Sequence, residues 1–126
     1  MMKFLTVIIV MLCALMPAHA QVVVNGVDIN KEKVEVVEVL VTERFSGKTV
    51  NVFVDYGQRT NFRAGGIDGK DSESRIVDPQ TKKEIAFASA AALLNFMETN
   101  NWEHYDSLLF RENQSATFYF YFRKKK

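Results

Sequence analysis

This sequence of 126 residues is poor in the residue types that carry most enzyme chemistry. It holds one cysteine, Cys13, and two histidines, His19 and His104. A single cysteine makes no disulfide framework, and so few sulfur and imidazole ligands exclude the usual zinc sites. Asp106 and Ser107 stand too close to His104 on one predicted strand to complete a Ser-His-Asp triad. We therefore expect no catalytic chemistry, no metal and no cofactor.

The chain also lacks an excess of one charge. Its 16 Lys and Arg residues stand against 15 Asp and Glu, a formal net charge of +1 at pH 7. Proteins that bind nucleic acids normally carry a strong basic excess, so no nucleic-acid partner is expected. The basic run at residues 123–126 is interpreted as a solvated tail.

Residues 1–20 have the parts of a secretory signal peptide. Lys3 precedes an apolar run over residues 4–16, and Ala18-His19-Ala20 is a small-x-small cleavage site. The run is too short to cross a bilayer as a helix, so no membrane span is expected after cleavage. We expect export to the periplasm or the extracellular space, with residues 21–126 forming a single domain. A buried N-terminal helix is the alternative.

The clearest helix pattern lies in residues 89–102. Four apolar side chains recur at helical spacing, namely Ala90, Leu93, Leu94 and Met97. Ser89 is expected to cap the first turn through its hydroxyl group. Asn100-Asn101 is expected to end the helix, because asparagine tolerates the left-handed backbone conformation.

Two hairpins are expected before this helix. Asn25-Gly26 between valines predicts a two-residue turn, with a loosely ordered arm as the alternative. Residues 33–45 and 50–56 alternate apolar and polar side chains and are expected to pair as antiparallel strands. In residues 33–45 the alternation of apolar and polar side chains is interrupted at Val36-Val37, which a β-bulge or a strand covered on both faces would explain.

Two further pairs of strands are expected. Short strands at 75–77 and 84–87 flank a turn that contains Pro79. After the helix, residues 102–110 and 116–123 flank a polar turn and form the last pair.

The last strand is expected to have one apolar and one polar face, because neighbouring side chains point to opposite sides of a sheet. Phe118, Phe120 and Phe122 are expected to pack under the helix with Leu93, Met97 and Trp102. Tyr119, Tyr121 and Arg123 fall on the opposite face and form a candidate interaction surface. The predicted fold is α+β, with an antiparallel sheet of four to six strands and one helix packed on one face.

Residues 57–74 break the alternation and are expected to form a long loop. Loops of this length are uncommon unless they are mobile or functional. Asp68, Asp71 and Glu73 make the loop a second candidate site.

Several short motifs resemble small secreted proteins of unknown function from Bacteroides-type bacteria. The motifs are Val-Asp-Tyr-Gly-Gln at 54–58, Glu-Ile-Ala-Phe-Ala-Ser at 84–89, Leu-Asn-Phe-Met at 94–97 and Asn-Trp-Glu at 101–103. The related pattern usually reads Gly-Trp-Glu, and Asn101 replaces that glycine here. The resemblance implies an exported protein and brings no catalytic residue. It also implies a possible O-glycosylation site at Ser107, within Asp106-Ser107-Leu108.

Two hypotheses of function follow from these patterns. The first is an exported, non-enzymatic binding or interaction module whose partner is a protein or a small ligand. Exposed tyrosines favour it, because aromatic side chains are enriched where proteins bind partners. The second is a small periplasmic hydrolase or ligand-processing protein that uses the loop carboxylates. A cleft that gathers them and raises a carboxyl pKa would favour it.

Overall fold

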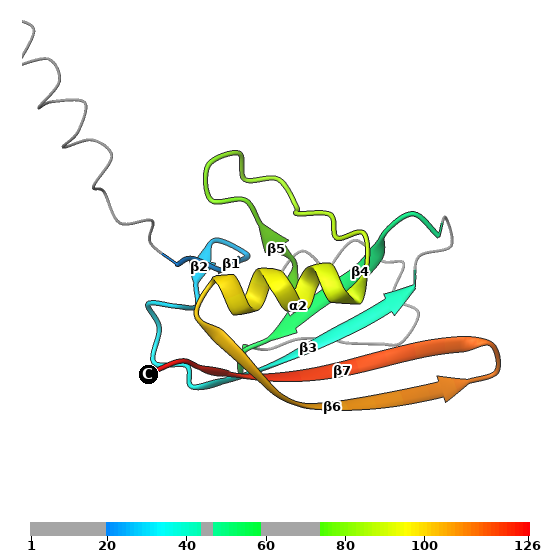
Figure 1. Ribbon diagram of the computed structural model, residues 1–126. Helices are drawn as coiled ribbons and strands as arrows, with labels where there is room; N and C mark the ends of the chain where they lie inside the picture. The colour runs from blue at the N-terminus through cyan, green and yellow to red at the C-terminus, as the bar shows by residue number, and fades with distance from the viewer. Residues whose placement is uncertain (1–19, 44–46, 59–73) are drawn as a thin grey trace, which may run out of the picture.

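The computed structural model describes residues 20–43, 47–58 and 74–126, which form two antiparallel sheets and one helix (Figure 1). The four-stranded sheet has the order β4-β3-β7-β6, with β3 at Val36–Glu43, β4 at Val50–Asp55, β6 at Trp102–Glu112 and β7 at Ser115–Lys124. The three-stranded sheet has the order β2-β1-β5, with β1 at Val23–Val24, β2 at Val27–Asp28 and β5 at Ile76–Val77. The helix, α2, spans Ala90–Thr99. The predicted α+β class, with one helix packed on a sheet, is confirmed.

The two ends of α2 follow the predicted capping pattern. The Ser89 hydroxyl accepts a hydrogen bond from the Ala92 N–H at 3.2 Å. At the other end, the Asn100 N–H bonds carbonyl groups of the last turn, and Asn101 adopts a positive φ of 73°. Asn101 therefore reverses the chain directly into β6.

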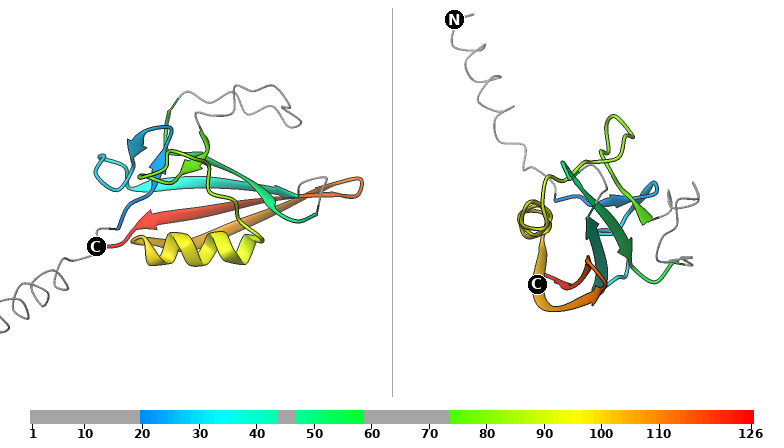
Figure 2. Two further views of the ribbon diagram at one scale, coloured as in Figure 1. Left: turned by 90° about the horizontal axis from the view of Figure 1, so that it is seen from above. Right: turned by 90° about the vertical axis from the view of Figure 1, so that its right-hand side faces the viewer.

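One core holds both sheets and the helix together. Leu93 and Met97 of α2 are fully buried with Trp102 and Phe122 of the four-stranded sheet. The same cluster takes in buried side chains from in and around the three-stranded sheet, including Val22, Val24, Ile29 and Ile76. The helix and the small sheet thus lie on one side of the four-stranded sheet (Figures 1 and 2). This arrangement leaves the opposite side as a separate surface, called here the outer face.

The predicted hairpins before the helix are present. Asn25 and Gly26 have φ angles of 49° and 77°, as a tight turn between β1 and β2 requires. Strands β3 and β4 pair antiparallel over six residue pairs. Neither explanation for the slip at Val36-Val37 holds. Strand β3 pairs with β7 without a bulge from Val36 to Thr42, and its buried and less buried side chains alternate. The strand begins at Val36, whose side chain is 49% exposed, so the slip in the pattern marks a strand end.

The bulge lies instead in β6, between His104 and Asp106. Tyr105 is the extra residue and has no partner in β7.

The strand predicted at 84–87 is also wrong. This segment makes only two isolated bridges, from Glu84 to Val77 and from Phe87 to Val50. These partners belong to β5 in one sheet and β4 in the other, so the segment crosses between sheets and follows neither long enough to be a strand.

Candidate interaction site

The outer face carries a group of tyrosines beside an arginine, called here the tyrosine face and defined as Tyr105, Tyr119, Tyr121 and Arg123. Tyr119 and Tyr121 are half-buried, and Arg123 is exposed. Phe120 and Phe122 alternate with them and are buried under the helix, as the sequence predicts. The structure therefore brings the three predicted surface residues together on one side of β7.

The bulge adds Tyr105 to this group. Its ring centroid lies 6.4 Å from that of Tyr121, with an interplanar angle of 48°. The Arg123 guanidinium carbon lies 5.2 Å from the Tyr105 ring centroid, within the range of a cation–π contact. Tyr105 is 44% exposed and is the most open ring of the tyrosine face.

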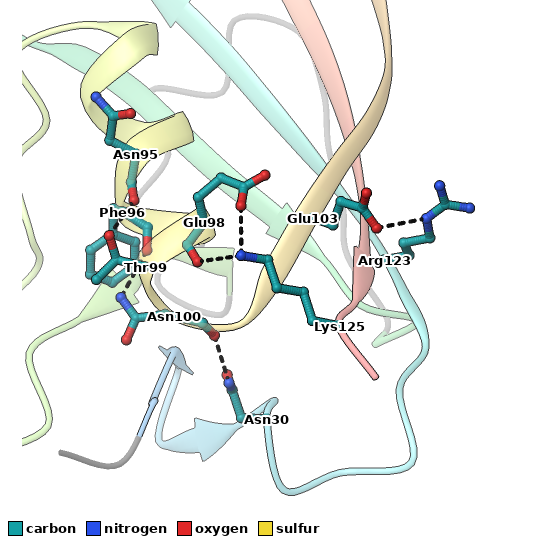
Figure 3. Close-up of polar contacts among 9 residues, drawn as sticks. All are labelled: Asn30, Asn95, Phe96, Glu98, Thr99, Asn100, Glu103, Arg123 and Lys125. Carbon is teal, nitrogen blue, oxygen red and sulfur yellow. Dashed lines mark hydrogen bonds and ion pairs between the residues drawn. The ribbon is translucent and has the colours of Figure 1, made fainter. Parts of the chain in front are cut away.

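Arg123 is oriented by a second contact. Its Nε lies 3.2 Å from Glu103 Oε2 across the β6–β7 pair (Figure 3). The two side chains are 57% and 50% exposed, and exposed ion pairs of this kind contribute little to stability. The pair therefore orients the guanidinium group rather than stabilising the fold.

Tyr121 is held by β3. A hydrogen bond from its hydroxyl to the Glu38 carboxylate, followed by partial burial, raises the pKa of Tyr121 above its ordinary value of 10.0. Glu38 is the residue of β3 that lies directly opposite Tyr121, so this contact joins the tyrosine face to the neighbouring strand.

Next to the tyrosine face lies a strip of exposed apolar side chains on β6, called here the apolar tip and defined as Leu108, Leu109 and Phe110. Their exposed fractions are 57%, 46% and 54%. Leu109 pairs with Phe118 on the helix side, while Leu108 and Phe110 pair with Tyr119 and Thr117 on the outer face. The β6–β7 hairpin extends past the N-terminal end of α2 (Figure 1), and these three side chains are exposed there.

The opposite edge of the same sheet is partly covered. The Arg75 guanidinium lies 4.1 Å from the Phe53 ring centroid on the outer side of β4. The Val50 N–H donates a hydrogen bond to the Phe87 carbonyl at 2.9 Å and so closes part of the β4 edge. Exposed aromatic and apolar side chains therefore gather on the β6–β7 side of the sheet.

The remaining candidate residues fall elsewhere. Asp68, Asp71 and Glu73 lie outside the described residues, so the loop site stays a prediction. Ser107 is exposed on β6, where its N–H bonds the Asp106 carboxylate at 2.8 Å. Its O-glycosylation stays a prediction that peptide mass analysis tests. Within 20–43, 47–58 and 74–126, no three side chains of the metal-ligating types gather into a site.

The His104 ring packs against two phenylalanine side chains of β7. It is half-buried, with its centroid 5.7 Å from Phe120 and 5.6 Å from Phe122 in edge-to-face arrangements. Its Nε2 atom is buried without a hydrogen-bond partner in the described part of the chain. This atom is therefore closed to solvent in the structure.

A cavity of about 410 Å³ lies beside the first turn of α2. Its lining includes Val41, Ser89 and Phe118, and Glu43 is its one charged residue among those described.

Sequence reasoning missed Tyr105 and the apolar tip. A signal for the tip was present, because three consecutive apolar residues in a strand cannot all face one core. Nothing in the local pattern marks Tyr105 as the extra residue of a bulge, since the bulge is defined by the pairing with β7.

Comparison with protein-family models, curated proteins and solved structures gives no match. Among the helices of the described residues, none has the length and apolar character needed to cross a membrane.

Proposed function

We propose that this protein is an exported, non-enzymatic binding module that engages its partner through the tyrosine face. The observation that carries the proposal is the meeting of Tyr105, Tyr119, Tyr121 and Arg123 on the side of the sheet opposite the helix. Tyrosine and arginine are enriched at the residues that dominate binding energy in protein interfaces.

Contacts of the tyrosine face with neighbouring side chains support the same function. The Tyr121 hydroxyl interacts with Glu38, and Arg123 pairs with Glu103. Side chains that are ordered before binding lose less conformational entropy when a partner arrives. Export is supported by the signal-peptide pattern of residues 1–20.

The test is affinity capture from the exported fraction of the native host, with the tagged protein and a variant carrying Tyr105→Ser and Tyr119→Ser. The matched control is Asn95→Ser on the exposed side of α2. We expect a partner that is retained by the wild type and the control, and lost from the double variant. Identical sets of captured molecules for all three proteins would contradict the proposal.

A further inference from the structure

We propose that β6 is a pairing edge for a second copy of this chain, so that two four-stranded sheets join into one continuous sheet. Strand β6 is 11 residues long and stands at the end of the strand order. Long, exposed, apolar edge strands readily pair with other chains unless they are covered. Pairing through β6 does not require the tyrosine face to bind a partner.

The hydrogen-bonding groups of β6 face the right way for such pairing. In an antiparallel pair, every second residue exchanges hydrogen bonds with the neighbouring strand. The Ser107 N–H bonds the Asp106 carboxylate at 2.8 Å, so Ser107 is one of the residues whose backbone points away from β7. By alternation, Leu109 and Arg111 are the next two with outward backbone groups.

A two-fold axis at Leu109 places these three residues opposite the same three residues of the second copy. Leu109 then lies opposite Leu109 of the second copy, and Ser107 lies opposite Arg111. On the outer face, Leu108 of each copy meets Phe110 of the other. Every member of the apolar tip thus gains an apolar neighbour. The outward backbone groups of Leu109 and Arg111 gain partners, and the Ser107 N–H exchanges its bond to Asp106 for one to the second copy.

The partner is a second β6 rather than β4 of another molecule. The β4 edge is partly closed by the hydrogen bond from Val50 to Phe87. Pairing of β6 with β6 is symmetric and ends at two copies, whereas pairing of β6 with β4 would continue into a ring or a fibre.

The small contact area predicts a weak dimer. At roughly 200 Å² for a large apolar side chain, the apolar tip offers on the order of 300 Å² per copy. A standard interface buries about 800 Å² per partner, so the dimer is weak and reversible. Sedimentation should therefore cover roughly 1 μM to 1 mM protein.

Disulfide cross-linking tests this register. Single cysteines are introduced into the full chain, in which Cys13→Ser removes the native cysteine. Directly opposed residues of a hydrogen-bonded pair have Cα atoms about 5.5 Å apart, which a disulfide can bridge. Leu109→Cys should therefore cross-link into a dimer under mild oxidation. The control is Ser107→Cys, because the two copies of position 107 are about 14 Å apart along the strands. Cross-linking at 107 and not at 109 would overturn the proposal.

The register also places Asp106 opposite Glu112 of the second copy, a repulsive pair at each end of the contact. Glu112→Lys should convert it to an attractive pair and lower the dimer dissociation constant roughly 2- to 30-fold. Glu35→Lys is the control, since it makes the same charge change at an exposed residue just before β3. A protein that stays monomeric across the concentration range in the wild type and in Glu112→Lys, or that pairs β6 with a different protein instead, would overturn the proposal.

Discussion

Replacing Asn30 with alanine is expected to destabilise the protein far more than its position between β2 and β3 suggests. Asn30 Oδ1 accepts hydrogen bonds from the Trp102 Nε1–H at 3.0 Å and the Val22 N–H at 3.1 Å. Its Nδ2 donates to the Asn100 carbonyl at 2.8 Å (Figure 3). One side chain therefore ties the N-terminal hairpin to the end of α2 and to the buried indole.

The expected loss follows from what the substitution leaves unpaired. Trp102 and Val22 are fully buried, so removal of the Asn30 side chain takes the acceptor away from two buried N–H groups. With ~1–1.5 kcal/mol for each of three hydrogen bonds, Asn30→Ala should cost ~3–4.5 kcal/mol. A domain of this size has a net stability of about 5–15 kcal/mol. The melting temperature should fall by at least about 12 °C.

Urea unfolding followed by fluorescence measures this loss directly, because Trp102 is the sole tryptophan. A double-mutant cycle isolates the indole bond: in a Trp102→Phe background, followed by circular dichroism, Asn30→Ala should cost about 1 kcal/mol less. Asn95→Ala is the control, since Asn95 is exposed on α2 and alanine favours helix. A loss below ~1 kcal/mol for Asn30→Ala would refute the reasoning.

Three further outcomes are expected. Trp102→Ala should lower stability by ~3–5 kcal/mol in urea unfolding, and Tyr121→Ala on the outer face clearly less; equal losses would contradict the burial of the indole. Glu38→Gln should lower the pKa of Tyr121 toward 10.0 in an ultraviolet titration of the phenols, and an unchanged curve would contradict the hydrogen bond. Because that raised pKa means that folding holds the proton more tightly, the associated stability is present below pH 10.0 and is lost as the pH rises through the higher folded pKa. Intact mass of protein from the native host should begin at Gln21, with or without cyclisation to pyroglutamate, and Met1 retained in a membrane fraction would contradict export.

Short-range rules in the sequence determined where the main elements start and stop. Ser89 caps α2 through its own hydroxyl, and Asn101 ends it because its backbone adopts the left-handed conformation. Asn25-Gly26 sets the first hairpin by the same preference. Alternation along β7 separated the buried Phe120 and Phe122 from Tyr119 and Tyr121, while Phe118 near the hairpin turn is half-buried. These features depend on residues only a few positions apart, so they can be predicted from a single chain.

The tertiary structure alone decided which of these elements meet and which stay uncovered. Asn30 bonds Trp102 across 72 positions of sequence, a contact that no local pattern encodes. The bulge at Tyr105 exists only relative to its pairing with β7. Likewise, the apolar run at residues 108–110 predicts a strand, whether that strand lies at the edge or in the middle of a sheet. It becomes a surface because β6 lies at the sheet edge and extends past the helix, and strand order is fixed by packing between distant segments.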